Sequence, residues 1–198
     1  MNVAIILAAG ESRRMGQPKQ LLPFGDKTML GCVLDAFQSP RVDETIVVLG
    51  HKADEIAAKI ISQAETPVPL KIVRNPRYQS GMFTSVQAGL QALPKQAALV
   101  LLALCDQPRL QRATVEKLIG QFENEHPQIL IPVFDGRQGH PLLFRAEYAK
   151  EILAMDESLT LKHFLASHAE EIVRLSTTDE GVLIDIDDRP TYERELRR

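Results

Sequence analysis

The sequence has few cysteines and no tryptophan: Cys32 and Cys105 stand far apart among 198 residues. Two such cysteines cannot build the disulfide framework of a small secreted protein, so we expect a reducing compartment and a cytoplasmic location. Cys105 ends an apolar run, and we interpret it as a small core residue rather than a nucleophile. No apolar run approaches the roughly 20 residues that a membrane-spanning helix needs, so we expect no membrane partner.

An excess of positive charge is also missing, because the formal net charge is -3 at pH 7. Proteins that bind nucleic acid commonly carry a basic surface, so we expect no nucleic-acid partner. Two nucleotide-binding fingerprints are absent as well. The first apolar run is not followed by G-x-G-x-x-G, and Lys19 is neither preceded by Gly nor followed by Ser or Thr, as a Walker A loop would require.

The sequence does contain alternating strand-like and helix-like segments. Its length and its content of 44% hydrophobic and 25% charged residues predict one α/β domain over residues 1–198. Continuous apolar runs predict strands covered on both faces at 3–7, 45–50, 70–73, 97–104 and 129–133. Helical spacing of apolar residues predicts helices at 27–37, 53–64 and 110–123. The alternation predicts a mostly parallel sheet with helices on both sides.

The pattern becomes less regular after residue 128. Two short strands are predicted around an Asp135-Gly136 turn. Helices are expected at 146–154 and 159–167, then strands at 171–176 and 181–188, and a short charged helix at the end.

The stretch "LAAGESRRMGQPKQLL", residues 7–22, directly follows the first predicted strand. Ligands of open α/β sheets bind at the carboxyl ends of the strands, and backbone N–H groups of a glycine-rich loop can face an anion. Arg13, Arg14 and Lys19 concentrate positive charge in this loop, which predicts a polyphosphate ligand. The alternative is a solvated connection with ordinary surface cations.

Carboxylates follow two later apolar segments. Asp106 comes directly after a predicted buried strand, where it could hold Mg²⁺ against phosphate oxygens; the alternative is a turn or helix-capping aspartate. Asp185, Asp187 and Asp188 cluster near the end of the chain, and a solvated acidic turn is the alternative there. A magnesium ion that keeps several waters needs only one or two of these carboxylates.

Four segments resemble the MobA-like nucleotidyltransferases, and within them the molybdenum cofactor cytidylyltransferases. Residues 7–22 resemble the signature L-A-A/G-G-x-S-x-R-M-G-x-x-K-x-L. "NPRYQSGMFTSVQAGL" at 75–90, "LCDQP" at 104–108 and "GRQGHPLLF" at 136–144 resemble three further family segments. The tail "DIDDRPTY" departs from the family's D-I-D-T-P-E-D, since Asp188 replaces Thr and Pro190 is displaced by one position.

The resemblance implies a three-layer α/β/α sandwich of the nucleotide-diphospho-sugar transferase type and a set of site residues. It implies catalytic roles for Arg14 and Lys19, and metal binding by Asp106 with Asp187 as the better tail match and Asp185 as the second. It implies that the second substrate lies near Gln107 and His140. The nucleotide-binding residues that it implies are Leu7, Ala8, Ala9, Gly10, Arg14, Lys19, Gly81, Ser85 and Asp106.

The implied reaction is attack of the terminal phosphate of molybdopterin on the α-phosphorus of CTP, with Mg²⁺ as cofactor and pyrophosphate as leaving group. The product would serve an apo molybdenum hydroxylase of the xanthine dehydrogenase type. Two alternatives stay open: a nucleotidyltransferase for another small phosphate, such as methylerythritol phosphate or a sugar phosphate, and a non-catalytic chaperone that inserts the finished cofactor. Ala9 stands where the guanylyltransferase branch typically has glycine.

Overall fold

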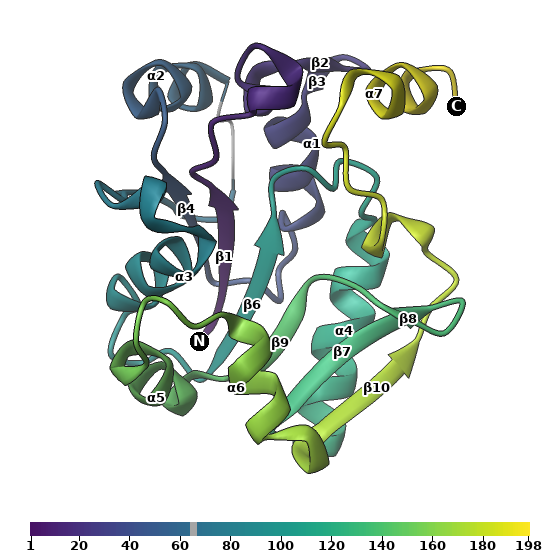
Figure 1. Cartoon of the computed structure of the whole chain (residues 1–198). Helices are drawn as coiled ribbons and strands as arrows, with labels where there is room; N and C mark the ends of the chain where they lie inside the picture. Colours follow the sequence, from purple (N-terminus) through teal and green to yellow (C-terminus); the bar gives the residue numbers. More distant parts are fainter. Residues whose placement is uncertain (64–66) are drawn as a thin grey trace.

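The computed structural model describes residues 1–63 and 67–198, so residue 64, the last of the predicted helix 53–64, lies outside the described residues. Within them, one sheet runs in the order β10-β7-β9-β6-β1-β4-β5, and β8 pairs with β7 (Figure 1). Its strands are β1 (Asn2–Ala8), β4 (Glu44–Leu49), β5 (Leu70–Arg74), β6 (Leu99–Leu104), β7 (Ile129–Phe134), β8 (Arg137–Gln138), β9 (Leu142–Arg145) and β10 (Ile172–Ser176).

Strand β1 lies at the centre of the parallel part of the sheet. It pairs in parallel with β4 on one side and with β6 on the other, so Leu7 lies beside both Val48 and Leu104. Strand β9 runs antiparallel between β6 and β7. The carboxyl ends of β4, β1 and β6 therefore meet at one edge, which is where an open α/β sheet binds its ligands.

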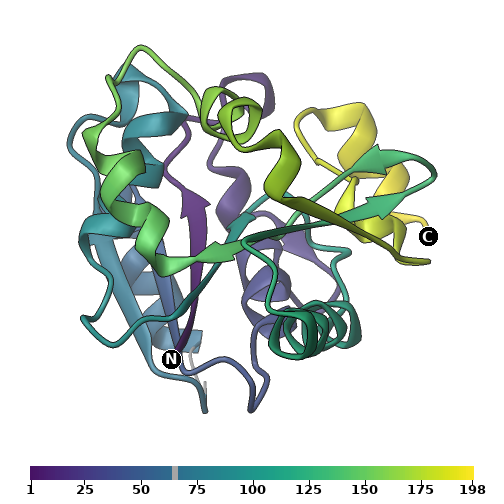
Figure 2. The same cartoon turned by 90° about the horizontal axis from the view of Figure 1, so that it is seen from below.

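Helices cover both faces of this sheet (Figure 2). Ala4, Ile6 and Ala8 of β1 belong to the core cluster on the side of α1, α2 and α4, whereas Val3 and Ile5 belong to the cluster on the side of α3, α5 and α6. This division follows from the two-residue period of a strand. The helices are α1 (Met29–Ala36), α2 (Ala53–Gln63), α3 (Met82–Gln91), α4 (Arg112–Glu125), α5 (Ala149–Ala154), α6 (Leu161–Ser167) and α7 (Arg189–Leu196). The predicted three-layer α/β/α sandwich is confirmed.

The start of the predicted helix 27–37 is corrected by the structure. Lys27–Thr28 form the short strand β3, which pairs antiparallel with β2 (Pro23–Phe24). Helix α1 begins at Met29, because the side chain of Thr28 accepts a hydrogen bond from the N–H of Gly31 at 3.1 Å and caps the helix.

The predicted strand at 181–188 is wrong. A short 3₁₀ turn covers Glu180–Val182, and the following residues do not join the sheet. The apolar alternation has a different cause: Ile186 is fully buried, and its N–H donates to the carbonyl of Asp106 at 2.9 Å. This segment is thus a docked loop with one side facing the protein interior, a pattern that a period of two cannot distinguish from a strand.

The Asp135-Gly136 turn between β7 and β8 is confirmed, with positive φ angles of 48° and 71°. In the part of the chain that the structure describes, no helix has the length and apolar content to cross a membrane.

Candidate active site

The loop after β1 is held in place by two polar side chains. Ser12 has a left-handed backbone conformation, with φ of 54°, and its Oγ accepts from the N–H of Lys19 at 3.1 Å. Gln20 is fully buried, and its Nε2 donates to the carbonyls of Ala8 at 2.8 Å and Gly10 at 3.1 Å. These bonds fold residues 8–20 back over the carboxyl end of β1, so that Lys19 faces the sheet edge.

An ion cluster forms where the loop meets the end of β6. Nζ of Lys19 lies 2.6 Å from Oδ2 of Asp106 and 2.8 Å from Oδ1 of Asp187. The other oxygen of Asp187 pairs with Arg14 at 2.8 Å. The side chains of Lys19 and Asp106 are only 12% and 15% exposed, whereas that of Arg14 is 66% exposed. The cluster therefore runs from the protein interior to the surface.

The neighbouring charges set the protonation states of this cluster. Burial acts to lower the pKa of Lys19, but the charge of Asp106 and the hydrogen bonds that Lys19 donates to both carboxylates outweigh it, and the pKa is raised above its usual range. Burial acts to raise the pKa of Asp187, yet hydrogen bonding to Lys19 and Arg14 holds that pKa below its usual range. Lys19 is therefore a fixed cation at neutral pH.

The C-terminal segment brings Asp187 to Asp106 because it is attached to the end of β6. Ile186 bonds to the backbone of Asp106, and the buried Gln107 donates from Nε2 to the carbonyl of Val182 at 3.1 Å and to Oδ1 of Asp185 at 2.8 Å. Burial, and secondly the charge of Asp106, raises the pKa of Asp185. Asp185 thus faces Gln107, and Asp187 faces the cations.

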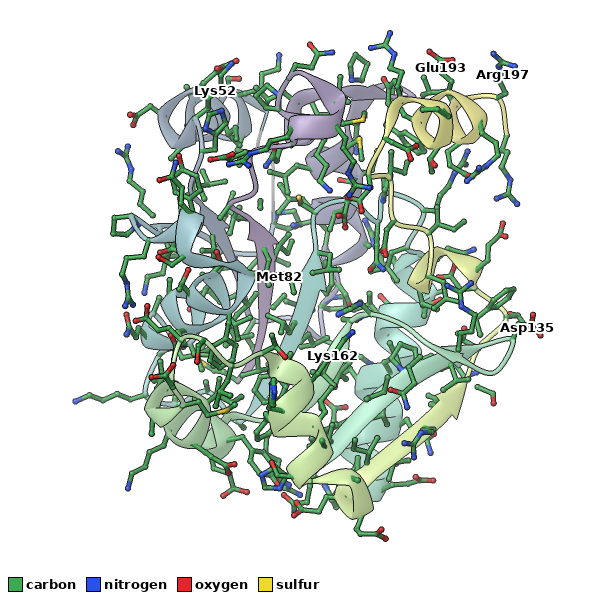
Figure 3. The ribbon with its side chains drawn as sticks, viewed as in Figure 1. Lys52, Met82, Asp135, Lys162, Glu193 and Arg197 are labelled. Atoms are coloured by element: carbon green, nitrogen blue, oxygen red, sulfur yellow. The ribbon has the colours of Figure 1, made fainter. Side chains whose placement is uncertain are left out.

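A cavity of about 230 Å³ adjoins this cluster. It is lined by Leu7, Ala9, Gly10, Lys19, Tyr78, Met82, Ser85, Leu104, Cys105 and Asp106. Ser85 lies in the first turn of α3 rather than at its cap, and its Oγ accepts from Nδ2 of Asn75 at 3.0 Å. Met82, which is labelled in Figure 3, also lines the cavity although it is 63% exposed. The structure therefore brings together six of the predicted nucleotide-binding residues around one space.

The remaining predicted residues lie outside this cavity. Ala8 is buried in the core cluster on the opposite face of the sheet. Gly81, with φ of 122°, lines a second cavity of about 200 Å³ between α3 and the segment before α6. Arg14 reaches the site only through Asp187, and Gln107 is turned toward Asp185.

His140 lies on the far side of the cluster, where its N–H donates to the carbonyl of Val182 at 2.9 Å. Burial lowers the pKa of the His140 ring, and the negative charge of Asp106 opposes this shift only in part. A neutral imidazole within reach of the charge of Asp106 can donate or accept a hydrogen bond without adding charge to the site.

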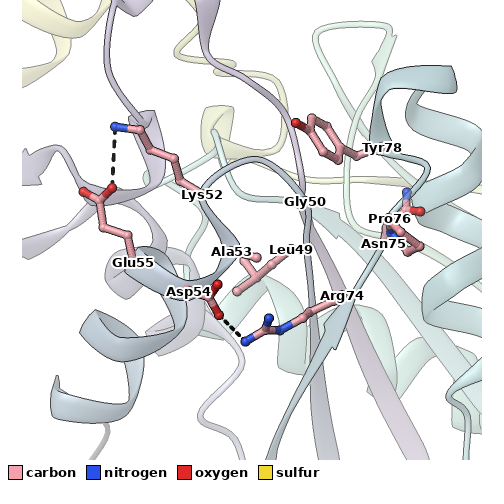
Figure 4. A pocket seen from close by; sticks show the side chains of 10 residues that line it. All are labelled: Leu49, Gly50, Lys52, Ala53, Asp54, Glu55, Arg74, Asn75, Pro76 and Tyr78. Atoms are coloured by element: carbon pink, nitrogen blue, oxygen red, sulfur yellow. Dashed lines mark hydrogen bonds and ion pairs between the residues drawn. The ribbon is translucent and has the colours of Figure 1, made fainter.

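A larger cavity of about 520 Å³ lies on the other side of Tyr78, between α2 and the end of β5 (Figure 4). Its charged side chains are paired with each other: Lys52 with Glu55 at 3.5 Å, and Arg74 with Asp54. These pairs are exposed and neutralised locally, so they provide weak attraction for a polyphosphate. The chemistry therefore belongs to the smaller cavity beside Lys19.

The carboxylates at the site fit a divalent cation. Oδ1 of Asp106 is buried without a hydrogen-bond partner, a costly state for a carboxylate oxygen that a metal ion would relieve. Among residues 1–63 and 67–198, no three Asp, Glu, His or Cys side chains form a cluster suited to metal. A divalent cation that kept several waters would not require a third protein ligand here.

Seven residues of this site are not predicted from the sequence: Ser12, Gln20, Asn75, Tyr78, Met82, Leu104 and Cys105, the last of which is expected to be only a core residue. Ser12 and Gln20 lie inside the recognised loop, and their roles depend on backbone groups that only the fold brings near. Tyr78 and Met82 lie in the segment 75–90, which resembles a family segment, but they are not among the residues that the resemblance implies. An exposed methionine next to a glycine-containing turn was a usable signal for a binding surface.

Comparison with known proteins points to one family. Residues 4–172 match the family described as MobA-like NTP transferase domain. The molybdenum cofactor cytidylyltransferase of Escherichia coli (strain K12) is 27% identical over 184 residues, which cover 92% of this chain and 89% of that protein. The nicotine blue oxidoreductase of Paenarthrobacter nicotinovorans is 30% identical over 154 residues, or 72% of this chain and 70% of that protein.

The fold is shared with solved structures. Rv0371c from Mycobacterium tuberculosis H37Rv superposes with a TM-score of 0.82 at 27% identity, over 99% of this chain and 98% of that one. The structure of its complex with manganese gives a TM-score of 0.78 at 26% identity, over 100% of this chain and 98% of that one.

Proposed function

The chain belongs to the family of MobA-like NTP transferase domains and is a nucleotidyltransferase, and from this premise we propose that it transfers CMP from CTP to the terminal phosphate of molybdopterin. Pyrophosphate is the leaving group, and Mg²⁺ is the cofactor. The same proposal places the enzyme in the cytoplasm, in keeping with Cys32 and Cys105, which are both unpaired.

The observation that carries the proposal is the cluster of Lys19, Asp106, Asp187 and Arg14 beside the cavity at the end of β1. In our proposal the nucleoside lies in the cavity against the backbone of residues 7–10 and the hydroxyl of Ser85. Its triphosphate then extends over Lys19 toward Arg14. Both cations can stabilise the negative charge that develops on the phosphates in the transition state.

A protein nucleophile is not needed, because a phosphomonoester oxygen is already anionic at neutral pH. Cys105 lines the cavity, but burial raises the pKa of its thiol to about 12, so it stays protonated. We therefore assign catalysis to alignment and charge neutralisation. A magnesium ion held by Asp106 and Asp187 would neutralise phosphate charge in the same place.

The second substrate is proposed to approach from the side of His140. Gln107 follows β6 and His140 follows β8, and neither residue lines the proposed nucleotide cavity. Because the side chain of Gln107 is buried, we assign it an indirect role: its hydrogen bonds hold Asp185 and the backbone of Val182 in place beside the second substrate. The match to a molybdenum cofactor cytidylyltransferase over most of the chain supports molybdopterin as the acceptor.

The choice of CTP over GTP is tested at Ala9, which is buried and lines the cavity. Its methyl group leaves less room for a purine, so Ala9→Gly should raise the kcat/KM for GTP several-fold relative to CTP. Ala8→Gly is the matched control, because Ala8 points into the opposite core, and its CTP-to-GTP ratio should equal that of the wild type. A wild type that uses GTP as well as CTP would contradict the cytidylyl assignment.

The whole proposal is tested by measuring pyrophosphate release with each of the four NTPs and Mg²⁺, with and without molybdopterin. We expect release only with CTP and molybdopterin together. Release with methylerythritol phosphate or a sugar phosphate instead would favour the first alternative, and binding without release would favour the chaperone. Since one relative is named an oxidoreductase, NADH and NADPH consumption is measured in parallel and is expected to be nil.

A further inference from the structure

Gln20 is a fully buried polar residue at the centre of the loop that follows β1. Its Nε2 donates to the carbonyl of Ala8 at 2.8 Å and to that of Gly10 at 3.1 Å. These two carbonyls lie on either side of Ala9, which lines the nucleotide cavity. Because the side chain is inaccessible, it cannot touch the nucleotide, yet it fixes the backbone on which the nucleotide would rest.

The same residue is coupled to the phosphate end of the site. Gln20 follows Lys19 directly within the 3₁₀ turn Lys19–Leu21. Ser12 completes the link, since its Oγ accepts from the N–H of Lys19 at 3.1 Å and contacts Oε1 of Gln20 at 3.4 Å. The side chain of Gln20 therefore connects the backbone on either side of Ala9 to the turn that carries Lys19. Ala9 lines the cavity proposed to hold the nucleoside (the base cavity), and Lys19 is the cation proposed to face the phosphates.

We propose that Gln20 is a positioning residue that fixes the distance between the base cavity and Lys19, and that it thereby sets discrimination among nucleotides. This inference rests on nucleotide binding by the proposed site and does not depend on the identity of the acceptor. A fixed distance between the base cavity and the Lys19 ammonium favours the one nucleotide whose base fits the cavity while its phosphates reach Lys19. A loosened spacing accepts several bases, each with poorer alignment.

The chemistry of the site requires an amide at this position. Two carbonyl oxygens need a side chain with two N–H donors, and Ser12 Oγ lies near the amide oxygen. Gln20→Glu keeps the shape but turns acceptor oxygens toward two carbonyls. Gln20→Leu keeps most of the volume and removes all of the bonds. Both changes remove the donor that Gln20 gives to the buried carbonyl of Ala8 and to the partly buried carbonyl of Gly10.

Gln87 provides a matched control for the general cost of losing a buried glutamine. It too is buried, and its Nε2 bridges two carbonyls, those of Ile152 at 3.2 Å and Met155 at 3.1 Å. These bonds join α3 to α5 and do not involve the loop after β1. Gln87→Leu should therefore reduce the thermal midpoint without changing nucleotide discrimination.

The test is titration calorimetry of CTP, UTP, GTP and ATP with Mg²⁺ on wild type, Gln20→Leu, Gln20→Glu and Gln87→Leu. We expect the ratio of dissociation constants between the best and the worst nucleotide to shrink roughly tenfold in both Gln20 variants and to stay unchanged in Gln87→Leu. Where turnover is measurable, kcat of Gln20→Leu should fall roughly tenfold to a hundredfold, because Lys19 is misaligned.

Ser12→Gly decides the question if the Gln20 variants do not fold. Glycine accepts the left-handed conformation of residue 12 and removes the hydroxymethyl group that bonds to Lys19 and Gln20, so it should shrink the same ratio several-fold. A folded Gln20→Leu or Ser12→Gly protein with the wild-type ratio would overturn the inference, and so would a ratio that shrinks equally in Gln87→Leu. Binding of the NTPs without transfer to molybdopterin would instead contradict the proposed acceptor and leave this test intact.

Discussion

Lys19 owes its role to the two carboxylates that surround it. A lysine that is 12% exposed would be costly to bury alone, but Asp106 and Asp187 both lie within hydrogen-bond distance of its ammonium. Such an arrangement suits anion binding, because an incoming anion can replace one of the two carboxylates beside the Lys19 ammonium. Because Asp187 is far more exposed than Asp106, it is the partner that a triphosphate can displace.

Arg14 and Arg13 form a matched pair for testing the cation cluster. Arg14 pairs with Asp187 at the site, whereas the adjacent Arg13 is 83% exposed and pairs only with Glu11. Lys19→Ala and Arg14→Ala should each lower kcat/KM by roughly a hundredfold or more, because each removes a charge-assisted contact in the transition state. Arg13→Ala should stay within a few-fold of the wild type.

Steady-state kinetics with CTP and molybdopterin measure these effects, and circular dichroism verifies the fold of each variant. If Lys19→Ala and Arg14→Ala both turned over at near-normal rates, the triphosphate would not lie over this cluster.

At the scale of elements, the sequence indicates the sheet well and the connections less well. Strands β1, β4, β6 and β7 are buried over most of their length, so their apolar runs are continuous and can be read without tertiary information. The edge strand β5 is at most half-buried, so the expectation that it is covered on both faces is wrong. Helix α3 was not predicted, because buried polar residues interrupt its apolar face. Thr84 and Ser85 both bond to Asn75, a contact that requires the fold.

The site, like the sheet, is predictable where the signal is local in sequence and unpredictable where residues meet only through the fold. Residues inside short motifs, such as Lys19 and Asp106, could be placed from their neighbours in sequence. The pairing of Lys19 with Asp187 could only be expected through resemblance, since the two residues come from opposite ends of the chain and meet through the docking of Ile186. The partners of Gln20 and Gln107 are mainly backbone carbonyls, which carry no sequence signal.

Helices α5 and α6 are connected by an ionic cluster remote from the site. His168 contacts Glu151 at 2.9 Å and Glu171 at 3.1 Å, and Tyr148 donates to Glu171. Hydrogen bonding to Glu151, and then to Glu171, raises the pKa of His168. A raised pKa in the folded state means that this contribution to stability is present below the ordinary histidine pKa of about 6.5 and is lost as the pH rises through the folded value.

The thermal midpoint should therefore fall as the pH is raised from 6 through the folded pKa of His168. The change should be small, roughly 1–3 °C, because the pairs are partly exposed. The difference between wild type and His168→Gln, measured by calorimetry across this range, isolates the effect, since other groups contribute equally to both proteins. A difference that does not vary with pH would show that folding leaves the pKa of His168 unchanged, which would contradict this prediction.

At the scale of the whole molecule, the two ends of the chain close the site together. Helix α7 lies next to β2 and β3 (Figure 1). In this region Ile186 and Tyr192 form one core cluster with Met15, Leu22 and Phe24. The hydroxyl of Tyr192 in α7 also donates to the carbonyl of Pro23. Asp187, which lies in the same segment, thereby reaches Lys19 and Arg14 of the loop after β1.

Asp187→Asn tests this closure, because the Asp187 carboxylate competes with phosphate for Lys19 and Arg14 and is also a proposed Mg²⁺ ligand. In EDTA, removing its charge should tighten CTP binding by roughly threefold to tenfold, as measured by calorimetry. With Mg²⁺, turnover should fall roughly tenfold or more, because a metal ligand is lost. Asp188→Asn is the control: Asp188 caps α7 through the N–H of Thr191, asparagine caps equally well, and neither quantity should change. Weaker CTP binding by Asp187→Asn in EDTA would contradict the competition and place Asp187 on the nucleotide itself.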